Sequence, residues 1–234
     1  MTTTVTPSPL KGISSMATRQ LLAELGAEFV RQTGRELHIE SVGGVDAAKR
    51  VQAGEVFDVV FLASDALAKL MQAGHLLNGS VVDLVHSGVA VAVPAGAPLP
   101  DLRSAESVKQ AVLHAPSVSY STGPSGVALL KMFETWGIVP AMQDRLKQAP
   151  AGVPVGTLVA QGQAALGFQQ LSELIHVLGI TIAGPLPDEI QINTTFSGAI
   201  GAYSTQQAAV SELLRFMSSR QADEAKRRQG MTPV

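Results

Sequence analysis

The chain has 234 residues, of which 46% are hydrophobic and 15% charged, a composition typical of a compact globular protein. Its formal net charge of −2 argues against a nucleic-acid-binding protein, because such a protein needs clustered cations that face phosphates. The absence of cysteine excludes disulfides and thiolate metal sites.

The N-terminal segment, residues 1–11, contains neither the basic part nor the apolar part of a signal peptide. We therefore expect a cytoplasmic protein, or a periplasmic one if Met1 replaces a removed signal peptide. A transporter partner is doubtful for a chain without an export signal. No membrane segment is expected either, because no stretch approaches the ~20 continuous apolar residues that span a bilayer.

The first part of the chain alternates between strand and helix patterns. Apolar residues recur at three- and four-residue steps after Ala17, which predicts an amphipathic helix. The nearly continuous apolar run at 56–62 suits a strand that is buried on both faces. Strands are expected at residues 10–13, 37–42, 56–62 and 81–93, and helices at 17–33, 45–53 and 66–73.

The second part continues the alternation and ends with two helices. The stretch 190–203 reads as β structure that returns toward the first part, with Gly198 and Gly201 permitting bends. Strands are expected at residues 117–121, 164–170, 180–183 and 190–203. Helices are expected from a cap at Ser104 or Ser107 to Leu113, and at 127–137, 144–146, 157–161, 171–177, 206–217 and 221–228.

This alternation predicts an α/β protein with mostly parallel sheets and helices on both faces. The β-rich passages at 81–93 and 190–203 would be two crossovers between two lobes. The expected lobes are residues 1–86 with 200–234, and residues 87–199. Two such connections form a hinge, with a ligand cleft between the lobes at the carboxyl ends of the strands.

The stretch Tyr120-Ser-Thr-Gly-Pro-Ser-Gly126 is the main candidate for a binding loop. A strand runs into a small-residue turn and then a helix start, where free N–H groups and the helix dipole favour an anion. Ser121, Gly123, Ser125 and Gly126 are therefore candidate ligand-binding residues. The alternative is a tight turn with a structural cap.

A second group of candidates lies near the N-terminus. Ser14 and Ser15 follow a strand and precede a helix, so they are either caps or ligand donors. Gly43 and Gly44 either permit a positive φ angle or let a ligand approach the backbone. The two serines and the two glycines would form the first-lobe half of the anion site.

Gln169 and Gln170 are polar residues at the end of an apolar strand. A buried amide is costly unless it is hydrogen-bonded, so we expect one of them to face the cleft and the other to support a loop. Lys49 and Arg50 on the second helix read as a solvated face, with a carboxylate contact as the alternative.

Motifs for other chemistry are absent. The histidines show no metal-ligand spacing, so neither a metal nor a cofactor is expected. No Gly-x-Ser-x-Gly elbow, P-loop or dinucleotide motif occurs. His86, in the expected hinge strand, is a weak candidate for a catalytic proton carrier; its alternative is a structural histidine.

Five segments, taken in order, carry a resemblance that covers essentially the whole chain. They are Gly12-Ile-Ser-Ser-Met16, Val45-Asp-Ala-Ala-Lys-Arg-Val-Gln-Ala-Gly54, Phe57-Asp-Val-Val-Phe-Leu-Ala-Ser-Asp65, Gly123-Pro-Ser-Gly126 and Ala165-Leu-Gly-Phe-Gln-Gln170. Together they resemble the type II periplasmic-binding-protein fold, specifically the molybdate-binding-protein-like family of solute-binding proteins. The resemblance implies two lobes, each a mostly parallel sheet flanked by helices, with two crossover strands as the hinge.

Two departures from this family bear on the ligand. Its molybdate binders place serine hydroxyls in both first-lobe loops, whereas the second loop here has no hydroxyl between Val42 and Asp46. A family tyrosine is replaced by Gln169 or Gln170. Because an oxyanion without a counter-charge needs many neutral donors, these losses argue against molybdate. The Gly-Pro-Ser-Gly loop and the strand at 168–170 also resemble aconitate isomerase-like proteins.

Two main hypotheses follow for the function. The first is a solute-binding protein that closes on a small anion, a polycarboxylate or an oxyanion, in the cleft between the lobes. The alternative is a cytosolic isomerase that moves a double bond in an unsaturated polycarboxylate such as aconitate. A cytosolic sensory module that reports a ligand to a partner is a third possibility.

Overall fold

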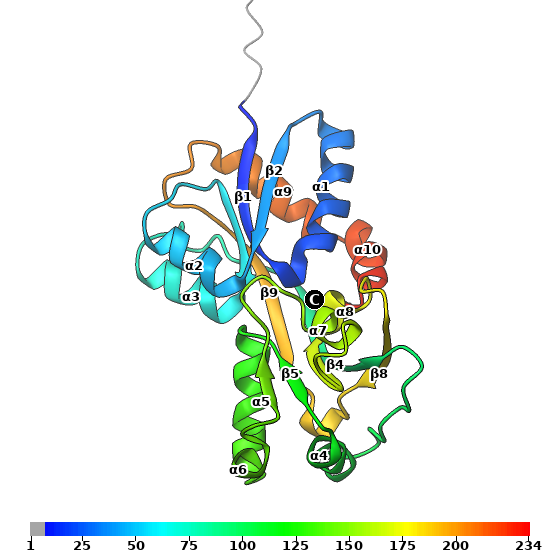
Figure 1. Ribbon diagram of the computed structural model, residues 1–234. Coiled ribbons are helices and arrows are strands. Elements are labelled where there is room, and N and C mark those ends of the chain that lie inside the picture. Colours follow the sequence, from blue (N-terminus) through cyan, green and yellow to red (C-terminus); the bar gives the residue numbers. More distant parts are fainter. Residues whose placement is uncertain (1–7) are drawn as a thin grey trace, which may run out of the picture. The chain divides into compact units, whose positions relative to one another are not determined.

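The computed structural model describes residues 8–234 (Figure 1). Its internal contacts divide it into two compact units. Unit 1 runs to Val85 and includes Thr195–Arg228 and Pro233–Val234; unit 2 comprises His86–Thr194 and Gln229–Thr232. The lobe boundaries expected at residues 86 and 199 stay a prediction. The expectations about export rest largely on residues 1–7, which lie outside the described residues.

Unit 1 is built on a sheet with the strand order β2-β1-β3-β9. The central strand β1 pairs in parallel with β2 on one side and β3 on the other, and β3 pairs antiparallel with β9. The strands are β1 (Leu10–Ser15), β2 (Leu37–Val42), β3 (Val59–Ala63) and β9 (Asn193–Ile200). The carboxyl ends of β1, β2 and β3 therefore lie at one edge.

Helices cover both faces of this sheet. On one face, Ile13 and Leu62 pack with Leu67 of α3 and Val51 of α2. On the other, the rings of Phe29 in α1 and Phe216 in α9 lie 5.9 Å apart. The helices are η1 (Met16–Thr18), α1 (Arg19–Thr33), α2 (Gly44–Gln52), α3 (Ser64–Gln72), α9 (Gln207–Ser218), η3 (Arg220–Ala222) and α10 (Asp223–Arg228).

Unit 2 has a sheet with the strand order β4-β7-β5-β6. Strand β5 pairs in parallel with β6 and β7, whereas β4 pairs antiparallel with β7 and β8. The strands are β4 (Val82–Pro94), β5 (Val118–Tyr120), β6 (Leu146–Gln148), β7 (Leu166–Gln170) and β8 (Ile180–Pro185), and β10 (Thr232–Pro233) lies near the chain end.

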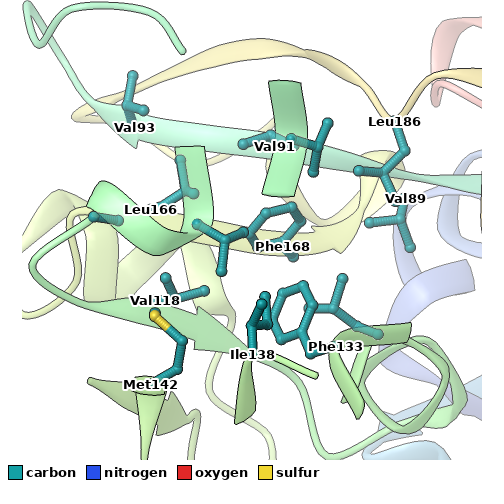
Figure 2. Close-up of a cluster of buried hydrophobic side chains, with 14 residues drawn as sticks. Val89, Val91, Val93, Val118, Phe133, Ile138, Met142, Leu166, Phe168 and Leu186 are labelled. Atoms are coloured by element: carbon teal, nitrogen blue, oxygen red, sulfur yellow. The ribbon is translucent and has the colours of Figure 1, made fainter. Parts of the chain in front are cut away.

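The main core of unit 2 lies between its sheet and helices α4 and α5 (Figure 2). Phe168 of β7 meets Phe133 of α5 edge to face, with ring centroids 6.0 Å apart. On the opposite face, Val155 and Val159 of α7 fill the space beside Gly167. The helices are α4 (Ala105–His114), α5 (Pro124–Thr135), α6 (Val139–Met142), α7 (Val155–Ala160), α8 (Leu171–Leu174) and η2 (Asp188–Ile190).

Several elements differ from the sequence prediction. The expected helix at 144–146 is wrong: Leu146 begins β6, and the Val118 N–H donates to the Arg145 carbonyl as this segment joins β5. Such a pairing is non-local, so a short apolar pattern could not reveal it. Strand β3 omits Val56, which is 57% exposed, whereas β1 extends through both serines. The strand expected at 81–93 is β4, which runs without a break through His86 and Gly88.

The structure gives Gly201 a packing role. A Cβ atom at this position would lie only 1.9 Å from the Phe57 carbonyl oxygen. We expect Gly201→Ala to lower the free energy of unfolding by about 2 kcal/mol or more, because backbone must move to relieve the clash. Urea titration monitored by circular dichroism measures this change.

Gly26→Ala is the matched control for this substitution. Gly26 lies inside α1, and its added Cβ would meet only the flexible end of Leu37 at 3.3 Å. Alanine favours a helix interior over glycine by about 1 kcal/mol, so the control should be neutral or stabilising. Equal losses in both variants would contradict the steric role of Gly201.

Candidate functional site

The first group of predicted residues gathers at the carboxyl end of β1. Ser14 is fully buried, and its hydroxyl lies 2.7 Å from the hydroxyl of Ser41 on β2. The parallel register places these two serines opposite each other. Ser15 is 6% exposed, and its buried hydroxyl has no hydrogen-bond partner within residues 8–234. Burying a hydroxyl without a hydrogen-bond partner costs free energy, so the Ser15 hydroxyl is available to hydrogen-bond a ligand.

The start of α2 lies against this serine. A Cβ atom on Gly44 would be 3.4 Å from the Ser15 Cβ, so the glycine gives the helix start its close approach to β1. Gly43 is the N-cap, and no side chain caps the helix. The first N–H groups of a helix have no intrahelical acceptor and attract negative charge. Unit 1 thus combines an uncapped helix start with an unpartnered buried hydroxyl.

The serine-glycine loop of unit 2 connects β5 to α5. The hydroxyls of Ser121 and Ser125 lie 3.2 Å apart. Gly123 is the N-cap of α5, and no side chain caps this helix either. The helix begins at Pro124, three residues earlier than the apolar pattern indicates, because proline is well suited to the first helical position.

Gly126 is required by the geometry of this loop. A Cβ atom there would lie 1.9 Å from the Ser121 carbonyl oxygen. Its own N–H donates to the Gly123 carbonyl at 3.0 Å. Gly126 is therefore needed because a side chain would not fit, and its N–H is not available to a ligand because it is hydrogen-bonded within the turn.

The two glutamines at the end of β7 have different surroundings. Adjacent strand residues point to opposite faces of the sheet. The Gln169 amide is used on both sides: its oxygen accepts from the Val155 N–H at 2.7 Å, and its nitrogen donates to Glu173 at 2.8 Å. Gln169 therefore anchors the start of α7.

Gln170 is 3% exposed, and its nitrogen donates to the Thr194 hydroxyl at 2.9 Å. Its carbonyl oxygen is buried without a partner among the described residues. A threonine hydroxyl can donate as well as accept, so either end of this amide can face outward. Of the two glutamines, Gln170 alone keeps an amide group available.

Glu173 is a functional candidate that the sequence reasoning missed. Burial raises the pKa of this carboxyl to about 7, although the hydrogen bond from Gln169 acts in the opposite direction. A pKa near neutrality is frequent among groups that transfer protons. The sequence signal was the i, i+4 spacing from Gln169, which becomes informative only once β7 is known to continue directly into α8.

Other missed residues share one cause. Ser41 was missed because the hydroxyl was sought between Val42 and Asp46, and the register with Ser14 is a tertiary property. Ser64 lies at the carboxyl end of β3, where its hydroxyl is 2.5 Å from that of Ser197. Strand alternation alone does not tell which serines meet across a sheet.

The remaining candidates lie elsewhere or are engaged. His86 is exposed on β4, and its proposed proton transfer stays a prediction. Arg50 donates to both Glu40 and Glu55, so its guanidinium is held within unit 1. Residues 8–234 contain no group of three or more His, Cys, Asp or Glu side chains arranged to hold a metal ion. In the same range, every helix is too short or too polar to cross a membrane.

Comparisons with solved structures identify the fold. The periplasmic molybdate-binding protein of Azotobacter vinelandii superimposes with a TM-score of 0.79 at 22% identity, covering 95% of this chain and 98% of that one. A tungstate-binding protein of Desulfovibrio alaskensis G20 gives a TM-score of 0.66 at 16% identity, covering 93% of each chain. These likenesses confirm the predicted α/β periplasmic-binding-protein fold.

Sequence comparisons identify the family. A protein of Pseudomonas sp. named aconitate isomerase is 37% identical over 228 residues, which are 95% of this chain and 87% of the relative. The family model described as bacterial extracellular solute-binding protein matches residues 10–232. The match spans both units, from the first strand to the last. The chain therefore belongs to the family of bacterial extracellular solute-binding proteins, as its sequence motifs indicated.

Proposed function

We propose that this protein binds a small polycarboxylate through neutral hydrogen-bond donors. The observation that carries the proposal is the buried Ser15 hydroxyl, which has no partner among residues 8–234 and lies beside the uncapped start of α2. Both groups favour a carboxylate oxygen: the hydroxyl donates to it, and the helix dipole stabilises its charge. Ser14 and Ser41 lie next to them. One of these two hydroxyls donates to the other, and the second hydroxyl keeps a proton that it can donate to the ligand.

Unit 2 offers a second set of donors of the same kind. Ser121 and Ser125 stand at the uncapped start of α5, and Gln170 has one end of its buried amide without a protein partner. These residues would bind a second carboxylate. That both sets serve one ligand in a cleft between the lobes stays a prediction.

The number of available donors favours an organic acid over molybdate. The Gln169 amide is fully occupied within the protein, and the Gly126 N–H is used in its own turn. A tetrahedral oxyanion held without a counter-charge needs a dense shell of donors, because desolvation of the ion must be offset. A polycarboxylate spreads its charge over separate carboxylate groups, and each group needs fewer hydrogen-bond donors around it than a tetrahedral oxyanion does. The 37% identical aconitate isomerase supports the same ligand class.

Calorimetric titration tests the ligand class directly. We expect heat on addition of trans-aconitate, cis-aconitate or citrate, and weaker binding of molybdate, tungstate and sulfate. Tight molybdate binding without a response to any tricarboxylate would contradict the assignment. No heat with any of the anions would remove the anion-binding proposal itself.

Ser15→Ala tests the donor that carries the proposal. A hydrogen bond to a charged group contributes about 1.5–3 kcal/mol, so affinity should fall roughly 10- to 100-fold. Stability should not fall, because the hydroxyl has no protein partner to lose among the described residues. Calorimetric titration and urea unfolding of the same samples measure the two effects separately.

Ser119→Ala is a matched control for that variant. Ser119 is also fully buried with a hydroxyl that has no partner among residues 8–234, but it lies within β5 and is not among the proposed ligand-binding residues. Its affinity for the ligand should equal that of the wild type. A similar loss in both variants would show that Ser15 acts through general packing rather than through the ligand.

A second function is supported by the relative named aconitate isomerase: a cytosolic isomerase that moves a double bond in an unsaturated polycarboxylate. The 37% identity extends over 95% of this chain, so both donor sets lie in the aligned part. Binding two carboxylates of a substrate would fix the carbon atoms between them for proton transfer.

Isotope uptake distinguishes the enzyme from a pure binding protein. Trans-aconitate incubated with the protein in deuterated buffer should yield cis-aconitate, with deuterium incorporated at the carbon that receives the proton. Proton NMR follows both events in one sample. Binding without product or isotope uptake would leave a solute-binding protein and exclude this substrate for the enzyme.

A further inference from the structure

The isomerase proposed above needs a group that takes up and releases a proton. The serines, glycines and glutamines predicted for its site do not exchange a proton at neutral pH in this way. We propose that Glu173 is this proton carrier, held in place by Gln169. The inference rests on the proposed isomerase function and adds the catalytic group that the predicted ligand-binding residues lack.

The position of Glu173 follows from the end of β7. This strand continues directly into α8, so Glu173 stands in the first turn after the strand. Tyr120 of β5 is paired in parallel with Phe168 of β7, so Ser121 leaves the sheet at the same edge as Gln169 and Gln170. The carboxyl therefore lies at the edge of unit 2 that carries the proposed donors.

The orientation of the carboxyl is fixed by a chain of hydrogen bonds. The Val155 N–H donates to the Gln169 oxygen at 2.7 Å, and the Gln169 nitrogen donates to a Glu173 oxygen at 2.8 Å. The backbone bond at Val155 determines which end of the Gln169 amide faces Glu173. One carboxyl oxygen is thus occupied by Gln169, and the other is the atom that would exchange the proton.

The electrostatic environment keeps both protonation states of Glu173 accessible. Its pKa is raised to about 7 by burial, with the Gln169 hydrogen bond opposing the rise. Strand β7 and helix α7, which pack against α8, contain no titratable side chain. Strands β4 and β8 also contact α8, through Ala90, Ala92, Ile180 and Ile182; β8 has no titratable side chain, and those of β4, Asp83 and His86, lie toward the other end of that strand. The segment Gln229–Thr232, whose Gly230 lies against Leu171, contains none either. His176, two residues beyond α8, is bonded through its ring nitrogen to Gln229.

The proposed step conserves atoms and electrons. The Glu173 carboxylate removes a proton from the methylene carbon next to the double bond, and that C–H electron pair moves into the three-carbon system. The carboxylic acid then returns a proton to the far carbon, where a new C–H bond forms as the double bond shifts. Glu173 ends in its starting state, and no oxidant or cofactor is consumed.

Glu173 is preferred to His86 on geometric grounds. Glu173 is hydrogen-bonded to Gln169, whereas His86 is exposed on the crossover strand β4. A proton carrier must be held in a fixed position, and the hydrogen bond from Gln169 fixes this carboxyl.

Glu173→Gln tests this assignment in the full chain. The amide keeps the size of the side chain and an acceptor for Gln169, but it cannot exchange a proton. We expect deuterium uptake and cis-aconitate formation to fall at least about 100-fold, with trans-aconitate affinity by calorimetry within a few-fold of the wild type. Glu106→Gln is the control, because Glu106 in α4 also accepts from a glutamine four residues away, Gln110, on an exposed surface.

Glu173→Asp supplies a second readout that a purely structural role would not change. If Glu173 acts as the base, kcat/KM for trans-aconitate should rise with pH as the carboxyl ionises, with a midpoint at about 7 in the wild type. The aspartate should retain partial activity with a displaced midpoint. The Glu106→Gln variant should reproduce the wild-type profile.

The outcomes separate this inference from the proposed isomerase function. Full activity of Glu173→Gln would overturn the assignment of Glu173 while leaving the isomerase intact. If Glu173→Gln loses ligand binding, an unchanged pH midpoint in Glu173→Asp overturns the assignment, and a displaced midpoint supports it. Wild-type protein that binds trans-aconitate without forming cis-aconitate would overturn the isomerase, and the role of Glu173 with it.

Discussion

Parallel pairing between neighbouring strands is the constraint on which the candidate site depends. In unit 1, β1 pairs in this way with β2 and β3, so that the residues that end these strands meet at one edge. In unit 2, β5 pairs with β7 in the same sense. Helices that follow such strands begin at that edge, and their free N–H groups face outward there. The fold therefore produces anion-attracting edges before any side chain is considered.

Hydrogen bonds within the protein then decide which polar side chains at these edges remain available to a ligand. Ser14 is paired with Ser41, and the Gln169 amide is used at both ends, whereas Ser15 and Gln170 each keep a buried polar atom without a partner among residues 8–234. Such atoms cost stability unless something binds them. In the function proposed above, a bound carboxylate offsets that cost.

Binding and catalysis need different groups on this fold. A solute-binding protein needs only donors that close around an anion, and the serines and helix starts supply these. An enzyme on the same fold needs one group that changes its protonation state near neutral pH. Glu173 has this property because it is buried beside an amide rather than beside a cation, which would have lowered its pKa. In our proposal, the carboxyl that Gln169 holds at the end of β7 is what distinguishes an isomerase from a receptor on this fold.

The sequence by itself determined the fold class, the family and the loops that contain the candidate residues, because strand and helix patterns and small-residue turns are local properties. It also indicated that the two glutamines would have different roles. Which of them stays available, and the partnership of Ser14 with Ser41, were decided only by the tertiary structure. Strand register and burial arise from residues far apart in the chain, and for that reason neither β6 nor the raised pKa of Glu173 could be read from local patterns.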